Sequence, residues 1–151
     1  MRDLKNLKIR EAGPKDIAAL AGLMTDLGYP CTPERMRDRF VRISAHPAYH
    51  TLVAEYGGRV IGMVGLETGL YYEMDGGYAR VSAFVVAAGY RRRGVGAALI
   101  GAAERRAREA GAHYIFLNSG RHRPDAHSFY EESGYELTGY RFSKMLGDAG
   151  P

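Results

Sequence analysis

The chain has 151 residues, a common length for one domain; 46% of them are hydrophobic and 25% are charged, as in ordinary soluble globular proteins. No apolar run approaches the roughly 20 residues that span a bilayer, and none follows the N-terminus, so we expect neither a membrane protein nor a signal peptide. The single cysteine, Cys31, excludes an internal disulfide and every multi-cysteine metal site. We therefore expect a cytoplasmic protein without a bound metal.

The net charge of +4 is unevenly distributed, because arginines cluster at Arg91–Arg93 and again at Arg105–Arg108. Such clusters indicate an anionic partner, which can be nucleic acid, a membrane surface or a phosphorylated cofactor, unless they are simply a solvated face. No interleaving of aromatic and basic residues and no nucleic-acid module accompanies them, so we do not expect a nucleic-acid partner.

The first third of the chain predicts one strand and two helices. Residues 8–10 form a short strand, and apolar residues at helical spacing predict a helix from Asp16 to a stop at Gly28. Thr32 is a suitable N-cap for a second helix, which runs toward Pro47.

The spacing of the apolar residues then changes from the helical period to an alternation with a period of two residues. Residues 51–56 and 59–64 flank Gly57-Gly58 and predict a β-hairpin. The remaining expected elements are a strand at 78–86, a helix at 94–110 closed by Gly111, a strand at 114–117, a short helix at 126–132, and two final strands at 135–138 and 141–145. The order predicts one α/β (α+β) domain over residues 1–151, with a mixed, mostly antiparallel sheet of about seven strands flanked by about four helices.

A basic, glycine-containing turn between a buried strand and a helix is the most informative segment. It reads Arg91-Arg92-Arg93-Gly94-Val95-Gly96. The first turn of a helix has backbone N–H groups without internal partners, and glycines let an anion approach them closely. The alternatives for a phosphate loop do not fit: a Walker A loop needs Lys after its second glycine, and the dinucleotide fingerprint needs a small residue where Leu99 stands.

This turn resembles the acyl-CoA loop, [QR]-x-x-G-x-[GA], of the GNAT superfamily of N-acetyltransferases. A second segment, residues 123–135, resembles the family signature A-x-x-F-Y-x-x-x-G-[FY], at the expected separation of one helix and one strand. The resemblance implies a GNAT-like fold and acetyl-CoA as cofactor. The cofactor-binding residues it implies are Phe84, Val86, Arg91, Arg92, Arg93, Gly94, Val95, Gly96, Ala97, Asn118, Arg123, Ala126, Phe129 and Tyr130.

The resemblance also assigns catalytic roles. The backbone N–H of Val86 would polarise the thioester carbonyl, as in an oxyanion hole. Tyr130 would donate a proton to the departing thiolate, because a phenol with a pKa near 10 can serve a thiolate within hydrogen-bond reach. Packing beside Phe129 is the alternative role for Tyr130.

This chain departs from the family pattern at the positions where many relatives have the general base. Many relatives have a carboxylate on the strand before the loop, where this chain has Arg80, Ser82 and Ala83. The nearest carboxylates in sequence are Glu67, Glu73 and Asp75; we take Glu73 as the base, and a chain of waters is an equal alternative.

The acceptor is predicted to be a small cationic amine near the turn that precedes this strand. Tyr71 and Tyr72 offer aromatic faces to an ammonium group, and Glu73 and Asp75 offer opposite charge. An ordinary exposed acidic turn is the alternative.

The sequence thus predicts an N-acetyltransferase that moves the acetyl group of acetyl-CoA to a primary amine by direct attack in a ternary complex. Cys31 has no adjacent base, which disfavours a covalent enzyme intermediate. A non-catalytic module that senses acyl-CoA and an acetyltransferase for protein or peptide amines are the alternatives, and a homodimer is open.

Overall fold

The computed structural model describes residues 4–120 and 124–148, which fall into two compact units that divide after Leu117. The first unit contains β1 (Lys8–Glu11), α1 (Ile17–Leu27), α2 (Pro33–Ser44), β2 (Tyr49–Tyr56), β3 (Arg59–Leu70), β4 (Gly77–Val86), α3 (Val95–Glu109) and β5 (Ala112–Leu117). The second unit contains α4 (Pro124–Glu132). The expectation of a single domain over residues 1–151 stays a prediction.

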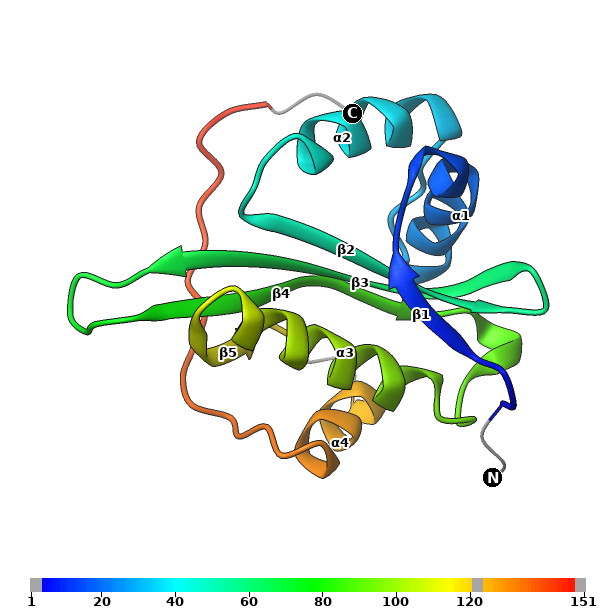
Figure 1. Ribbon diagram of the computed structural model, residues 1–151. Helices are drawn as coiled ribbons and strands as arrows, with labels where there is room; N and C mark the ends of the chain where they lie inside the picture. Colours follow the sequence, from blue (N-terminus) through cyan, green and yellow to red (C-terminus); the bar gives the residue numbers. More distant parts are fainter. Residues whose placement is uncertain (1–3, 121–123, 149–151) are drawn as a thin grey trace. The chain divides into compact units, whose positions relative to one another are not determined.

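The first unit is built on a five-stranded sheet in the order β1-β2-β3-β4-β5. The first four strands pair antiparallel and β5 pairs parallel with β4, so the predicted mixed, mostly antiparallel sheet is confirmed. Helices α1 and α2 cover one face of the sheet and α3 covers the other (Figure 1).

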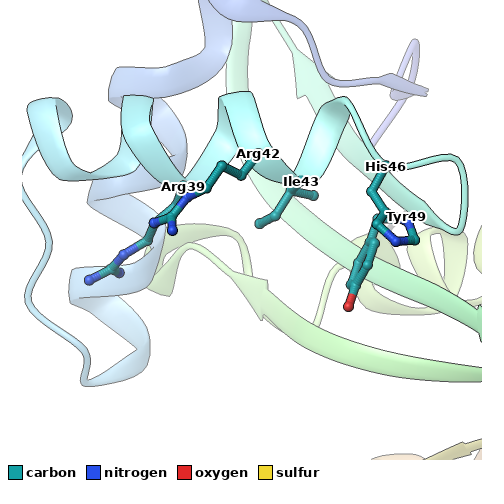
Figure 2. A pocket seen from close by; sticks show the side chains of 5 residues that line it. All are labelled: Arg39, Arg42, Ile43, His46 and Tyr49. Carbon is teal, nitrogen blue, oxygen red and sulfur yellow. The ribbon is translucent and has the colours of Figure 1, made fainter. Parts of the chain in front are cut away.

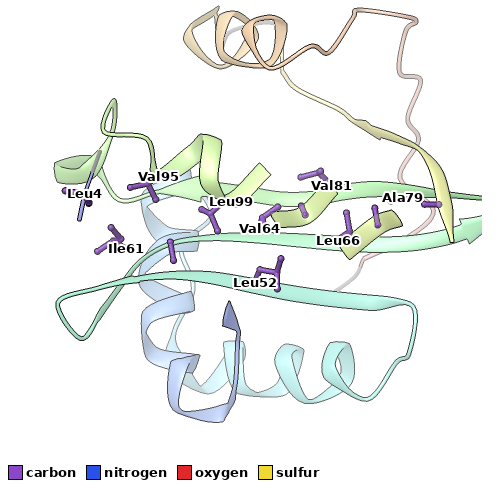
Figure 3. Packing of buried hydrophobic residues seen from close by; sticks show 13 residues of the cluster. Leu4, Leu52, Ile61, Val64, Leu66, Ala79, Val81, Val95 and Leu99 are labelled. Carbon is purple, nitrogen blue, oxygen red and sulfur yellow. The ribbon is translucent and has the colours of Figure 1, made fainter. Parts of the chain in front are cut away.

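Each face of the sheet has its own apolar core. Alternating side chains of β2 show the division, because Leu52 and Ala54 face α3 whereas Val53 faces α1 and α2. On the α3 side, Val64, Leu66, Val95 and Leu99 are among the buried residues (Figure 3). Both faces are therefore closed by apolar packing against helices, in agreement with the predicted sheet flanked by helices.

A β-bulge at Ser82 changes the face to which β4 directs its side chains. Gly65 pairs with Ala83 and Leu66 pairs with Val81, so Ser82 is the extra residue. Before the bulge, Val81 faces the α3 core; after it, Ala83 and Val85 face the core of α1 and α2. The second half of β4 is thereby turned relative to the first.

The ladder between β4 and β5 ends where the bulge begins. Its last pair is Val81 with Leu117, whereas β4 continues to Val86. The two parallel strands are thus paired along only the first half of β4. The second half leads directly into the turn before α3.

Arg10 links the N-terminal strand, β1, to Asp16 at the start of the first helix. Its guanidinium donates to both carboxylate oxygens of Asp16, at 2.8 and 2.9 Å, and to Glu55 on β2 at 2.8 Å. The backbone N–H of Gly13 also donates to Asp16 at 2.8 Å. These bonds satisfy a carboxylate that is only 3% exposed and hold its pKa below the ordinary value of 3.8, chiefly through the bonds from Arg10.

The second unit differs from the prediction. Helix α4 is confirmed, and Gly134 ends it in the left-handed conformation, with the N–H of Tyr135 donating to the carbonyl of Tyr130 at 2.9 Å. The two strands predicted at 135–138 and 141–145 are wrong: these residues have no regular structure, and Leu137 and Phe142 are 93% and 94% exposed. A strand forms only against a partner, and the described part of this unit contains no other strand to supply one.

We expect Asp16→Asn to destabilise the protein by about 2 kcal/mol near neutral pH, because it removes the charge of a buried carboxylate that accepts two hydrogen bonds from Arg10, while Arg10 keeps Glu55 as its second partner. A depressed carboxyl pKa contributes stability that is fully present above the unfolded-state value and is lost as the pH falls through the folded-state value. The difference between wild type and variant should therefore be constant above about pH 5 and shrink below pH 4. Urea unfolding at several pH values measures it.

Asp26→Asn is the matched control, since Asp26 is an exposed residue of α1, the helix that Asp16 precedes. Its unfolding midpoint should equal that of the wild type. If Asp16→Asn behaved in the same way, the Arg10–Asp16 pair would not be a stabilising link.

Candidate active site

The turn between β4 and α3 is tied to the end of the strand. The N–H of Ala87 donates to the carbonyl of Ile61 at 2.8 Å, and Nε of Arg91 donates to the carbonyl of Val86 at 3.1 Å. Residues 88–90 form one turn of 3-10 helix between these two bonds. The basic turn is therefore held in register with β4.

Two residues of this turn adopt the left-handed backbone conformation. Gly94 has φ of 85°, which glycine accommodates without cost, whereas Arg92 has φ of 60°. The left-handed conformation costs a residue with a Cβ about 1–2 kcal/mol. Strain of this kind is concentrated at functional sites, where surrounding contacts enforce it.

The turn opens directly onto the N-terminus of α3. The first intrahelical bond runs from the N–H of Ala98 to the carbonyl of Gly94 at 3.1 Å, and no side chain of the described residues caps the helix. The N–H groups of Val95, Gly96 and Ala97 accordingly precede the helical ladder and carry the positive end of the helix dipole. This arrangement suits a phosphate group.

The three arginines of the turn have different surroundings. Arg93 lies over the ring of Tyr90, with 5.9 Å between its guanidinium carbon and the ring centroid. Arg91 donates to Val86 as described, and both Arg91 and Arg92 are exposed. Arg91 and Arg93 therefore make contacts within the turn, and Arg91 and Arg92 present charge to solvent.

Close packing fixes the position of α3 and hence of its N-terminus. Val95 and Leu99 are almost fully buried against the sheet. A Cβ at Gly62 on β3 would lie 3.0 Å from Leu99 Cδ1 and 3.1 Å from the carbonyl oxygen of Val85. Only glycine allows this approach without moving the helix, so Gly62 sets how closely α3 sits on the sheet.

Most residues that the sequence assigns to the cofactor lie in one continuous stretch of the first unit. Phe84 and Val86 belong to the second half of β4, after the bulge, and Arg91–Ala97 follow after the short 3-10 turn. Asn118, Ala126, Phe129 and Tyr130 belong to the second unit, where Tyr130 contacts the rings of Phe129 and Tyr135 at 5.5 and 6.1 Å. Arg123 lies outside the described residues.

The predicted acceptor turn lies at the opposite end of β4 from Val86. Nine residues of strand separate Gly77 from Val86, which is about 30 Å. Glu73 and Asp75 are exposed. The two tyrosines do not form a joint aromatic surface, because Tyr71 packs against Tyr78 and His113 whereas Tyr72 is fully exposed. The hydroxyl of Tyr71 is buried without a hydrogen-bond partner among the described residues, and burial raises its pKa.

A row of polar residues that the sequence analysis did not assign crosses the sheet beside the bulge. Tyr49, Glu67 and Arg80 are register partners on β2, β3 and β4. Arg80 forms an ion pair with Glu67, and a hydrogen bond to Glu67 raises the pKa of Tyr49. The signal in the sequence is the presence of Glu67 and Arg80 in otherwise apolar strands.

The same face carries an open pocket of about 330 Å³. It is lined by Arg39, Arg42, Ile43, His46 and Tyr49, which come from α2 and the segment that links it to β2 (Figure 2). Tyr49 therefore belongs both to the pocket and to the polar row.

Among the residues that the structure describes, no group of three or more His, Cys, Asp or Glu side chains is arranged to hold a metal ion. No helix in that part of the chain has the length and hydropathy needed to cross a membrane.

The chain is similar to known acetyltransferases. A sequence profile of the acetyltransferase (GNAT) family matches residues 18–135. The aminoalkylphosphonate N-acetyltransferase of Salmonella typhimurium is 29% identical over 140 residues, which are 92% of this chain and 91% of that protein.

Solved structures share the fold. A GNAT family acetyltransferase from Staphylococcus aureus has a TM-score of 0.81 at 28% identity and covers 93% of this chain and 98% of its own. An aminoglycoside N-acetyltransferase in complex with CoA has a TM-score of 0.82 at 18% identity, over 94% of this chain and 96% of its own. With the profile match spanning most of its length, the chain belongs to the GNAT family of acetyltransferases and is an acetyl-transferring enzyme.

Proposed function

We propose that the protein transfers the acetyl group of acetyl-CoA to the primary amine of a small molecule, by direct attack of the amine on the thioester in a ternary complex. The observation that carries the proposal is the strained basic turn, Arg91–Gly94, held against the end of β4 at the uncapped N-terminus of α3. The pyrophosphate of CoA is the anion that this family presents to such a turn.

The cofactor would lie along two backbone segments. The N–H groups of Val95, Gly96 and Ala97 would bind the pyrophosphate, with charge from the exposed arginines. The second half of β4, past the end of the β5 ladder, would accept the pantetheine arm, and the N–H of Val86 would polarise the thioester carbonyl. Bound acetyl-CoA would supply the thioester, and the protein would position it and donate hydrogen bonds to it.

Proton transfer requires an acid and a base. Tyr130 is the proposed acid, on the strength of its place in the family motif. Glu73 is the base that the sequence analysis proposes, but its turn lies at the opposite end of β4 from Val86. Glu67 of the polar row lies nearer to Val86 along the sheet, on the face covered by α1 and α2, and is proposed as the alternative base.

The acceptor is proposed to be a small primary amine that also carries an anionic group. The support is the Salmonella relative, whose name gives aminoalkylphosphonates as its acceptors. At neutral pH such a molecule is cationic at the amine, as the sequence analysis expects, and anionic at the other end.

We expect Gly94→Glu to abolish CoA binding, because it fills the turn, forces a side chain into a left-handed conformation and adds a charge of the same sign as phosphate. Gly94→Ala keeps the conformational strain without the charge and should weaken binding less. Isothermal titration with CoA measures both.

Gly22→Glu is the control for the added charge, since Gly22 lies on α1 with open space around it. It should bind CoA normally. Normal binding by a folded Gly94→Glu variant would place the cofactor elsewhere.

We expect Tyr130→Phe to lower kcat by roughly tenfold to a few thousandfold and to leave CoA affinity nearly unchanged, as for the loss of one general acid. Single-turnover measurements separate chemistry from product release. Tyr140→Phe, at a highly exposed position of the same unit, is the control. A single-turnover rate equal to that of the wild type would reduce Tyr130 to a packing role.

The base is tested by comparing the double variant Glu73→Gln, Asp75→Asn with the single variant Glu67→Gln over pH. If Glu73 is the base, the double variant should show a raised KM or a displaced basic limb of kcat/KM, whereas Glu67→Gln should keep the wild-type profile. The reverse pattern would contradict Glu73 and assign the base to Glu67.

A further inference from the structure

Tyr90 is an aromatic residue beside the basic turn that neither the sequence analysis nor the proposed function uses. It ends the 3-10 turn that follows β4, and its backbone N–H donates to the carbonyl of Ala87 at 2.9 Å. Its ring is half-buried and packs against the apolar core on the α3 side of the sheet. The ring also contacts Tyr56, the last residue of β2, edge to face, with 6.2 Å between centroids. Backbone and ring together therefore hold Tyr90 against the sheet.

The contact with Tyr90 distinguishes Arg93 from the other two arginines of the turn. The guanidinium carbon of Arg93 lies 5.9 Å from the centroid of the Tyr90 ring, within the range of a cation–π interaction. Arg91 instead donates through Nε to the carbonyl of Val86, and Arg92 is exposed. A guanidinium group can lie against an aromatic ring and still use its N–H groups as a planar fork for a phosphate.

The charge of Arg93 is not neutralised within the described part of the chain. The ion pairs there are formed by Arg10, Arg80 and Arg106, and none includes Arg93. Arg93 directly precedes Gly94, the residue from which α3 begins, so its side chain starts beside the N–H groups of Val95, Gly96 and Ala97. A cation at this place adds to the positive end of the helix dipole, and both attract the same anion.

We propose that Tyr90 is a positioning residue for the cofactor: its ring holds the guanidinium of Arg93 where that group binds the pyrophosphate of CoA together with the N-terminus of α3. The inference rests on the proposed function and adds to it a residue that precedes the motif at 91–96. Because the ring restricts the side chain of Arg93 before the cofactor arrives, binding loses less conformational entropy.

The first experiment measures the Kd of CoA by isothermal titration. Arg93→Gln should raise Kd roughly tenfold or more, as for the loss of a charge-assisted hydrogen bond. Tyr90→Leu should raise Kd by roughly threefold to fivefold, because the ring contact is lost while the charge remains. Tyr90→Phe keeps the ring and should bind as the wild type does. Tyr90→Met is a second apolar replacement, to be used if the leucine variant does not fold.

The double variant Tyr90→Leu, Arg93→Gln separates positioning from a general structural role. If Tyr90 acts through Arg93, the double variant should bind CoA no more weakly than Arg93→Gln alone. If Tyr90 only supports the fold, its substitution should weaken binding by the same factor in both backgrounds. That additive result would overturn the inference and leave the proposed function intact.

Two control variants and a second ligand complete the comparison. Tyr29→Leu, between α1 and α2, and Arg105→Gln, on α3, change exposed residues of the same types and should not alter Kd. An equal loss in Arg105→Gln and Arg93→Gln would overturn the inference. The loss in Arg93→Gln should be the same for 3′-dephospho-CoA as for CoA; a loss that disappears with this ligand would assign Arg93 to the 3′-phosphate and contradict the proposal.

A second measurement does not depend on CoA. Binding of inorganic pyrophosphate is followed by phosphorus NMR with the same proteins. Weaker binding by Tyr90→Leu and Arg93→Gln than by the wild type, Tyr90→Phe and Arg105→Gln supports the inference, even if the wild type does not bind CoA, in which case the proposed function fails alone. Equal binding by all of these proteins, or no binding by the wild type, overturns the inference.

Discussion

The second half of β4 is the constraint on which the rest of the active site depends. One inserted residue, Ser82, turns this half relative to the first, and the ladder with β5 ends at the same point. A fully registered β5 would cover that edge of β4 with its own backbone. Beyond the end of this ladder, the strand runs toward the basic turn while paired with β3. In the proposed complex the extended arm of the cofactor takes the place that a longer β5 would occupy.

The position of the basic turn is fixed from both sides. On the strand side, Arg91 donates to the carbonyl of Val86; on the helix side, Gly62 permits α3 to lie close to the sheet. The strained backbone of Arg92 is enforced by these attachments. The N–H groups at the start of α3 therefore require little reorganisation to bind an anion, which lowers the entropic cost of association.

Local patterns in the sequence predict the elements of the first unit well, and long-range pairing limits the rest. The hairpin around Gly57-Gly58, the N-cap at Thr32 and the glycine turn before α3 are all confirmed, because each depends on a few neighbouring residues. The strands expected at 135–138 and 141–145 depend on a partner strand, which no local pattern specifies. The pocket beside α2 was not predicted for the same reason: Arg39 and Tyr49 come together only when α2 packs over β2. The bulge at Ser82 exists only as a mismatch of register between two strands, so residue spacing within β4 does not reveal it.

The most direct test of the central claim is a titration of CoA into nitrogen-15-labelled protein, followed by amide chemical shifts. The account predicts the largest shifts at the N–H groups of Val86, Gly96 and Ala97, where backbone groups would bind the thioester end and the pyrophosphate. Amides of the β2–β3 turn at Gly57 and Gly58 should not move. Saturable binding that leaves Val86, Gly96 and Ala97 unchanged, with its largest shifts on α1 and α2, would contradict the placement of the cofactor along β4 and the N-terminus of α3.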